Sequence, residues 1–276
     1  MSETIRYEVR GGVAIVTLNR PERLNAINAQ MGAALTGALI EAAGNPLVGA
    51  MIITGEGRAF CAGGDADFLI ESVVGGQDQD TSPDEPNPAF LKVLPEAPPH
   101  YRTRYSFAAA MPIPTFAAVN GSAVGAGLAL ALSCDFRFGT PHTKFIAPFS
   151  RIGMTAELGL AWTLTNAIGR GPARDMLLSA RPIGTDEALR WGLITQVFDS
   201  ETFFDQSLAF AQEMVKSCSP RSIRALKAAL DAAPNQSFAE SFEMARLDAR
   251  AAIRSDDFRE GIAALREKRA PNWPGQ

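Results

Sequence analysis

The order of secondary-structure patterns in residues 5–54 restricts the fold of this 276-residue chain more than any other feature. Two runs rich in β-branched residues, 5–9 and 13–18, flank Gly11-Gly12, which is typical of a two-residue hairpin turn. Residues 28–43 have apolar side chains at helical spacing, and the short apolar run Val48–Thr54 is typical of a buried strand. Strand, helix and strand in this order predict an α/β fold with a parallel sheet and crossover helices.

The rest of the chain divides into a core and a helical end. We predict a buried strand over Thr115–Val119, a helix over Gly125–Ser133 and a further strand over Asp135–Gly139. After residue 200 only helical spacing recurs, through 202–217, 220–231, 237–254 and 256–268. Residues 1–200 are therefore interpreted as the core, and residues 201–276 as a helical C-terminal region.

Residues 75–100 interrupt this pattern. They contain six of the 18 prolines and a local excess of acidic side chains. Strand and helix patterns resume after them, so we interpret the segment as a long surface loop or lid within the core and not as a domain boundary.

The few cysteines and histidines exclude several kinds of site. Cys61, Cys134 and Cys218 lie far apart without a C-x-x-C pair, which argues against a disulfide framework or a zinc site. His100 lies in the predicted loop and His142 in a predicted hairpin, and neither has an obvious Ser or Cys partner for a hydrolytic triad. We expect a protein without a metal, in a reducing, cytoplasmic setting.

The charge and hydropathy patterns argue against nucleic-acid and membrane functions. The formal net charge of −4 provides no general attraction for nucleic acid. The longest apolar stretch, around 123–133, is too short and too rich in glycine to span a bilayer. We therefore predict a soluble protein that binds neither nucleic acid nor membrane.

Two glycine-rich turns, Arg58–Asp65 and Asn120–Gly127, each follow an apolar strand and precede a helix. Small residues at such turns let a ligand approach main-chain N–H groups, and the two turns could direct one N–H each at a single oxygen. The alternative is that the glycines only permit tight packing. The second turn lacks the G-x-G-x-x-G spacing of a dinucleotide site, which disfavours a nicotinamide cofactor.

Five motifs in order resemble the enoyl-CoA hydratase/isomerase (crotonase) superfamily. The helical tail that ends in Lys268–Pro271 is also similar. The motifs are Val16–Pro21, Asn25-Ala26, Ala59–Asp65, Ala118–Gly121 with Gly125–Gly127, and Cys134-Asp135. The resemblance implies a crotonase-type ββα spiral core and a C-terminal helical trimerisation region. It also implies a homotrimer or a dimer of trimers, with the tail at the interface.

The resemblance further implies an acyl-CoA substrate whose thioester oxygen lies between the N–H groups of Gly64 and Ala126. CoA is then part of the substrate, and no separate cofactor is expected. Lys268 would reach a phosphate, either within its own subunit or from a neighbouring one, although a solvated surface charge explains this residue equally well. For Asp65, helix capping is an alternative explanation. The other substrate-binding or CoA-binding residues implied are Arg23, Ala26, Ala62, Asp65, Val124 and Phe149.

One carboxylate distinguishes the possible reactions. Hydratases of the family use two glutamates, and at the matching positions this chain has Ala129 and Phe149. Isomerases of the family carry a single acid near Glu157, where it moves a proton between two carbons. Leu158, Leu160 and Trp162, with Phe149, are the expected apolar surroundings that raise the pKa of such a base. The alternative role of Glu157 is that of an ordinary acid in the first turn of a helix over 157–168.

We therefore expect an enoyl-CoA isomerase that uses Glu157, Gly64 and Ala126, with the loop 75–100 bordering the acyl pocket. Two alternatives stay open. The first is a hydratase or another crotonase-type lyase or hydrolase. The second is an acyl-CoA-binding protein that has lost catalysis.

Overall fold

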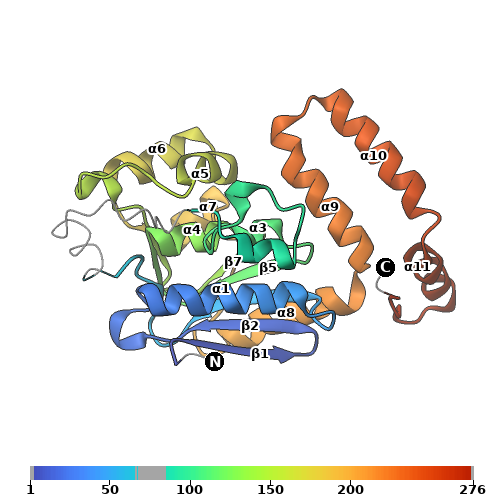
Figure 1. Cartoon of the computed structure of the whole chain (residues 1–276), viewed down its shortest axis with the longest axis horizontal. Helices are drawn as coiled ribbons and strands as arrows, with labels where there is room; N and C mark the ends of the chain where they lie inside the picture. Colours follow the sequence, from blue (N-terminus) through green and yellow to red (C-terminus); the bar gives the residue numbers. More distant parts are fainter. Residues whose placement is uncertain (1–2, 66, 68–84, 275–276) are drawn as a thin grey trace.

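A computed structural model describes residues 3–65, 67 and 85–274 of the chain and contains two sheets (Figure 1). In spatial order, the six-stranded sheet consists of β1 (Ile5–Arg10), β2 (Val13–Leu18), β3 (Ala50–Gly55), β5 (Thr115–Val119), β7 (Phe136–Gly139) and β10 (Gln196–Val197). The four-stranded sheet consists of β4 (Ala59–Cys61), β6 (Ser122–Val124), β8 (Lys144–Ile146) and β9 (Ile183–Gly184).

The larger sheet begins with the predicted hairpin and continues with parallel strands. β1 and β2 pair in antiparallel register, and Gly11 and Gly12 between them have φ angles of 56° and 78°, which glycine adopts at little cost. From β2 onward every neighbouring pair in this sheet is parallel. The predicted α/β class with a parallel sheet is confirmed.

Helices cover both faces of this sheet. The helices of the core are α1 (Ala29–Gly44), α3 (Phe107–Ala110), α4 (Ala126–Leu132), α5 (Leu160–Ile168), α6 (Arg170–Ser179), α7 (Thr185–Trp191) and α8 (Phe203–Ser217). Alternate strand residues such as Val16 and Ile53 bury against α1 and α4. The intervening residues, such as Ile15 and Phe116, bury against α8. By these contacts α8, which the sequence groups with the tail, is the second covering layer of the sheet.

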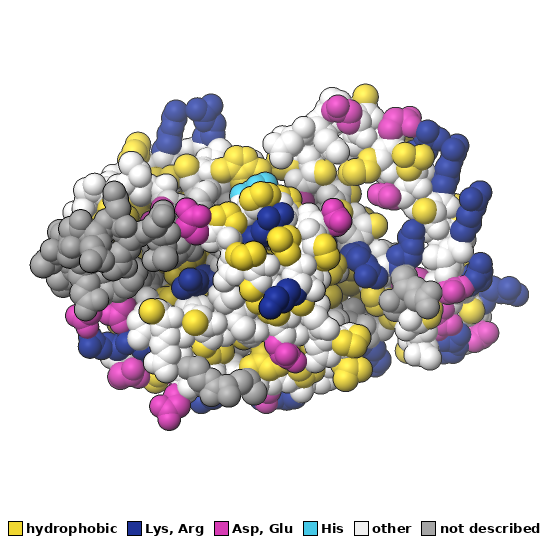
Figure 2. Space-filling view, viewed as in Figure 1, with side chains coloured by type: hydrophobic (Ala, Val, Ile, Leu, Met, Phe, Trp, Pro, Cys, Tyr) yellow, Lys and Arg dark blue, Asp and Glu magenta, His cyan; other side chains and the backbone are white. Residues whose placement is uncertain are grey.

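The tail beyond α8 extends away from the sheets as three helices (Figure 1). These are α9 (Pro220–Ala232), α10 (Phe238–Ala252) and α11 (Asp256–Glu267), each within two residues of its predicted bounds. We refer to them as the tail arm. α9 and α10 contain no buried residue, and Figure 2 shows apolar side chains open on this part of the surface. The exposed large apolar residues of the tail arm are Leu226, Leu230, Phe238, Phe242, Leu247, Ile253, Phe258, Ile262 and Leu265.

One part-buried and one buried set of polar contacts hold the tail arm to the core and its helices to each other. Lys227 Nζ donates to the carbonyl oxygens of Ala108 and Ile113, both at 3.2 Å, and to Asp135 Oδ2 at 2.8 Å. These three acceptors match the three donors of an ammonium group. Asp257 accepts a hydrogen bond of 2.5 Å from the hydroxyl of Ser219, the N-cap of α9, and thereby joins α11 to α9.

Two local expectations differ from the structure, and a third lies partly outside the described residues. The helix predicted over 157–168 begins only at Leu160, because Leu158 and Gly159 are left-handed, with φ angles of 58° and 69°. His142 lies in no hairpin, since β7 and β8 on either side of it join different sheets. Of the predicted loop, residues 75–84 lie outside the described part, and residues 85–100 contain short 3-10 helices, with Phe90 buried and stacked on Phe107.

In the described part of the chain, no helix is both long and apolar enough to cross a bilayer.

Candidate active site

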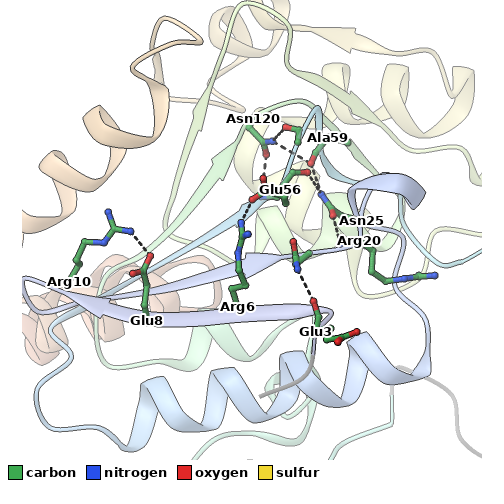
Figure 3. Close-up of polar contacts among 12 residues, drawn as sticks. Glu3, Arg6, Glu8, Arg10, Arg20, Asn25, Glu56, Ala59 and Asn120 are labelled. Atoms are coloured by element: carbon green, nitrogen blue, oxygen red, sulfur yellow. Dashed lines mark hydrogen bonds and ion pairs between the residues drawn. The ribbon is translucent and has the colours of Figure 1, made fainter.

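Two asparagines hold the turn that leads from β3 into β4 (Figure 3). The buried Asn25 donates to the carbonyl oxygens of Glu56 at 3.0 Å and Ala59 at 2.8 Å. Asn120, at the end of β5, donates to the carbonyl oxygens of Gly57 at 2.8 Å and Ala59 at 3.4 Å. The turn is thus held by side chains from two other segments, so the strand that follows starts in a defined position.

Parallel pairing of β4 with β6 brings the two glycine-rich turns together. Ala59 pairs with Ser122, and Cys61 pairs with Ala123. A Cβ atom on Gly63 would lie only 2.8 Å from the carbonyl oxygen of Val124 and 3.7 Å from the nitrogen of Ala126. The first turn therefore passes directly beside the start of α4, at a distance that only glycine permits.

Main-chain bonds around Gly64 determine where its N–H group points. The Gly63 carbonyl accepts from Ile27 N–H at 2.7 Å, and Asp65 N–H donates to the Ile27 carbonyl at 3.1 Å. In a trans peptide the C=O and N–H groups point in opposite directions. Since the Gly63 carbonyl points at Ile27, the N–H of Gly64 points away from it.

Ala126 provides a second main-chain donor. It is the first residue of α4, after Gly125 with a φ of 52°, and the first N–H groups of a helix have no partner within that helix. Among the described residues, neither the N–H of Ala126 nor that of Gly64 has an acceptor. Two adjacent turns thus present two main-chain donors.

Glu157 lies in the turn just before α5, not in its first helical turn. Its carbonyl accepts from Leu160 N–H at 3.1 Å, and its side chain is half-buried. The left-handed Leu158 that follows is strained, because at a positive φ the Cβ atom of a residue other than glycine lies too close to the backbone. Ala156 and Leu158 pack against the core cluster that also contains the buried Ala129 and Phe149. The half-buried Glu157 therefore lies between two residues that pack against this apolar cluster, and α5 contacts α4.

Of the expected apolar surroundings, Leu160 is fully buried and Leu158 half-buried, whereas Trp162 is 49% exposed in the single chain. The structure therefore places Trp162 largely at the surface.

The residues expected near CoA lie close to one another. Ala62 N–H donates to the carbonyl of Leu24 at 3.0 Å, which places it beside the Arg23–Ala26 segment. Arg20 donates to the Ala26 carbonyl at 2.6 Å and to Asp65 Oδ2 at 2.8 Å. The hydrogen bond from Arg20 holds the pKa of Asp65 below its usual range. Asp65 is thus engaged within the protein, and it also accepts from the N–H of Asp67 at 3.2 Å, as a capping residue does.

Three other predicted residues have different surroundings. Arg23 is exposed and lies 3.3 Å from Asp67. Val124 ends β6 beside the first turn, as its carbonyl contact with Gly63 shows. Lys268 is the exposed C-cap residue of α11 and has a left-handed φ of 54°. Within one chain the structure does not bring Lys268 to the other site residues.

A family model for enoyl-CoA hydratase/isomerase matches residues 8–276. The chain belongs to this family. A 1,2-epoxyphenylacetyl-CoA isomerase of Escherichia coli is 32% identical over 276 residues, which cover 100% of both chains. A protein of Rhodobacter capsulatus named "Probable enoyl-CoA hydratase" is 37% identical over 273 residues, which cover 99% of this chain and 98% of the relative.

Solved structures of the enoyl-CoA hydratase/isomerase family have the same fold. An enoyl-CoA hydratase/isomerase of Mycobacterium paratuberculosis superposes with a TM-score of 0.84 at 28% identity, covering 99% of both chains. An enoyl-CoA hydratase of Polaromonas sp. JS666 gives a TM-score of 0.84 at 26% identity, covering 98% of this chain and 99% of that one. The predicted crotonase-type fold is confirmed, and the protein is an acyl-CoA enzyme of this family.

A cavity of about 870 Å³ lies elsewhere, on the sheet face beside the start of α8. It is lined by β1, the turn after β3, Asn120 and the first residues of α8, and by none of the predicted site residues. Four of its charged groups form two ion pairs, Arg6 with Glu56 and Arg10 with Glu8 (Figure 3). Since the donors implied by the family resemblance lie at the two glycine turns, the candidate active site is at these turns and not in this cavity.

Two residues at the site escaped the sequence reasoning. Arg20 lies inside a family motif, but its partner Asp65 is 45 residues away, and no local pattern connects them. Cys61 lies inside the family motif Ala59–Asp65, but the sequence assigns it no role of its own, and its sulfur accepts a hydrogen bond from Gly63 N–H at 3.5 Å. The one available signal was its place two residues before Gly63-Gly64, where a side-chain acceptor can close a turn.

Proposed function

We propose that this enzyme moves a double bond in an acyl-CoA, with Glu157 as the only proton carrier and Gly64 and Ala126 as the oxyanion donors. One observation carries the proposal. Two unpartnered main-chain donors from adjacent turns accompany a half-buried carboxylate, while the positions of the two hydratase glutamates hold the buried apolar residues Ala129 and Phe149.

The reaction needs one base and one electrostatic partner. Glu157 would remove a proton from C2 of a 3-enoyl thioester, and the electron pair would move onto the thioester oxygen as an enolate. The donors of Gly64 and Ala126 would stabilise that oxygen; loss of one such donor typically costs about 2.7–4 kcal/mol in the barrier. The protonated Glu157 would then return the proton to C4. No further cofactor enters this sequence.

The CoA portion would lie along Arg23, Ala26, Ala62 and Asp65, with Val124 and Phe149 bordering the acyl end. The proximity of Ala62 to the segment that contains Arg23 and Ala26 supports one continuous binding surface. The E. coli relative, named for an isomerase reaction on a CoA thioester, supports the isomerase assignment.

Hydration of a 2-enoyl-CoA is the second candidate, because the Rhodobacter relative carries a hydratase name. In that case Glu157 would activate water instead of a carbon acid. The buried Ala129 and Phe149 can neither orient water nor accept a proton, and they weigh against it.

The experiment offers both a 3-enoyl-CoA and a 2-enoyl-CoA to the wild type and to Glu157→Gln. We expect isomerisation to fall by about 10³-fold in the variant, since general acid–base groups contribute about 10²–10⁴-fold. The dissociation constant of a saturated acyl-CoA should change by less than about twofold, because glutamine has nearly the same size and shape as glutamate and leaves the rest of the binding surface unchanged. Glu213→Gln on the exposed side of α8 is the matched control.

Unchanged isomerisation by Glu157→Gln would exclude this residue as the proton carrier. Rapid hydration without isomerisation by the wild type would favour the hydratase. Binding without turnover on either substrate would favour the non-catalytic alternative.

We also propose that the tail arm joins copies of this chain into a trimer or a dimer of trimers. Its exposed leucine and phenylalanine side chains support this, since monomeric proteins rarely leave so large an apolar surface in water. Lys268 would then approach the CoA phosphates of a neighbouring subunit. Sedimentation equilibrium tests the assembly, and a monomer at working concentration would contradict it.

A further inference from the structure

Cys61 lies where the two donor-bearing turns meet, and it contacts both of them. Toward the first turn, its sulfur accepts the hydrogen bond from Gly63 N–H at 3.5 Å. Toward the second, a Cβ atom on Gly127 would lie 2.5 Å from the Cys61 carbonyl oxygen, 2.7 Å from its Cβ and 2.9 Å from its Sγ. Gly127 directly follows Ala126, so the Cys61 side chain is in van der Waals contact with the second residue of α4.

From these contacts we propose that Cys61 is a positioning residue that, together with the main-chain bonds to Ile27, sets the direction of the Gly64 donor and also sets its spacing from the Ala126 donor. The inference rests on the proposed role of these two N–H groups. It assigns to the thiol no contact with substrate.

The direction of the Gly64 donor depends on the peptide units on either side of Gly63. Gly63 has a φ of 94°, a backbone conformation that glycine adopts and leaves at little energetic cost. Its carbonyl is held by Ile27, and its N–H is held by the Cys61 sulfur. Without the sulfur, the buried N–H of Gly63 would lose its acceptor, and only the bonds to Ile27 would then hold the peptide unit that carries the Gly64 N–H.

The thiol is chemically suited to this task and to no other at the site. Cys61 is fully buried, and burial raises the pKa of its thiol to about 12. The sulfur therefore remains protonated at neutral pH and is not a nucleophile. It can still accept one weak hydrogen bond while filling the space between β4 and α4.

Cys134 provides a matched control in the same chain. It too is buried, with burial raising its pKa to about 12, and it lies at the opposite end of α4. Its sulfur contacts the Leu130 carbonyl at 3.7 Å and neither of the glycine turns. Loss of a buried thiol as such is therefore tested separately from loss of this particular acceptor.

The experiment compares the wild type with Cys61→Ala, Cys61→Ser and Cys134→Ala. The first readout is the carbonyl stretching frequency of bound butyryl-CoA labelled with carbon-13 at the thioester carbon, which falls as hydrogen bonds to its oxygen strengthen. The second readout is kcat and KM for double-bond migration, each determined individually. A donor turned away from the oxyanion lowers kcat and leaves CoA binding intact.

We expect Cys61→Ala to lose part of the downward frequency shift and to reduce kcat about tenfold, a fraction of the loss caused by removing a donor outright. KM should stay within about twofold. Cys61→Ser keeps an acceptor and should recover most of both quantities, whereas Cys134→Ala should match the wild type. Gly127→Ala, which pushes α4 away from Cys61, should also reduce the shift and is informative if Cys61→Ala does not fold.

If Cys61→Ala shows the same carbonyl frequency shift as the wild type, the inference is overturned and the proposed function stays intact. The same holds for Gly127→Ala if Cys61→Ala does not fold. Equal losses in Cys61→Ala and Cys61→Ser would overturn it as well, because both a missing and a present acceptor would then act alike. Absence of any shift in the wild type would instead contradict the oxyanion site, and with it the proposed function.

Discussion

The sheet core and the tail arm bury their aromatic side chains very differently. Phe116 in β5 is fully buried, stacked on Phe136 with ring centroids 4.8 Å apart, whereas Phe242 in α10 is 57% exposed. The core completes its own apolar interior, but the tail arm depends on the contacts of Lys227 and Asp257 and leaves its apolar side chains uncovered. The core therefore encloses its own apolar side chains, whereas those of the tail arm are left exposed for the proposed contact with other copies of the chain.

The same substitution in the two regions should give opposite results. Phe116→Ala should lower the free energy of unfolding by about 3–5 kcal/mol at every protein concentration, since it opens a cavity in a packed core. Phe242→Ala should change the unfolding of the free subunit by less than about 0.5 kcal/mol. Its effect should appear as weaker self-association, and hence as a dependence of stability on protein concentration.

Urea unfolding at several protein concentrations and sedimentation equilibrium measure both effects. If Phe242→Ala destabilises the protein as much as Phe116→Ala, and equally at all concentrations, the two regions do not differ in the way described.

Removal of the Lys227 ammonium group should loosen the tail arm alone. Lys227→Met leaves two carbonyl oxygens and Asp135 without this donor, although Asp135 still accepts from the N–H and hydroxyl of Thr115. We expect the free energy that holds the tail arm to the core to fall by about 2 kcal/mol, which is typical of a hydrogen bond to a charged group. Hydrogen exchange should accelerate in α9 and leave β3 and β5 unchanged.

Lys216→Met, on the exposed end of α8, is the control and should leave exchange in α9 unaltered. Uniformly faster exchange across the sheet in Lys227→Met would mean that Lys227 stabilises the core and not the attachment of the tail arm.

The difference between the regions also explains what the sequence predicts well. Helical spacing alone places the tail helices to within two residues, because each is separated from the next by a serine or proline break. The hairpin at Gly11-Gly12 is predicted for the same local reason. Local patterns such as these need no knowledge of distant partners.

The parts that the sequence does not predict depend on distant partners. β4 and β6 are three residues long and look like glycine turns until their parallel pairing is known. The left-handed conformation of Leu158 shifts the start of α5 past Glu157. A leucine in the sequence does not predict a positive φ, because residues with a bulky side chain rarely adopt one. At the site, the family motifs lead to the donors and Glu157, but the contacts of Cys61 emerge only in three dimensions.

The smallest expected effect concerns acid sensitivity at the end of the tail arm. Glu260 accepts hydrogen bonds from Arg269 and from the N–H of Asn272, and the bond from Arg269 is the larger cause that lowers its pKa to about 2. A carboxylate whose pKa is lowered by folding stabilises the fold at pH values above its unfolded pKa of about 4.3. This contribution disappears as the pH falls toward the pKa of the folded state.

Glu260→Gln should therefore loosen residues 269–274 at pH 7 and differ progressively less from the wild type as the pH falls from about 4.3 toward 2. Hydrogen exchange or NMR of this segment measures the difference. A difference between the variant and the wild type that stays constant down to pH 2 would show that the charge of Glu260 is not what holds the segment.

The use of peptide N–H groups as the proposed donors has a consequence for how the site responds to genetic change. Nineteen of the twenty coded amino acids supply an N–H, so a library of point mutants would record positions 64 and 126 as constrained by shape and hardly at all by chemistry. Proline is the exception, and Ala126 is the first residue of a helix, where proline is sterically welcome. Substitutions could therefore replace the proposed acid, Glu157, while the two proposed main-chain donors remain.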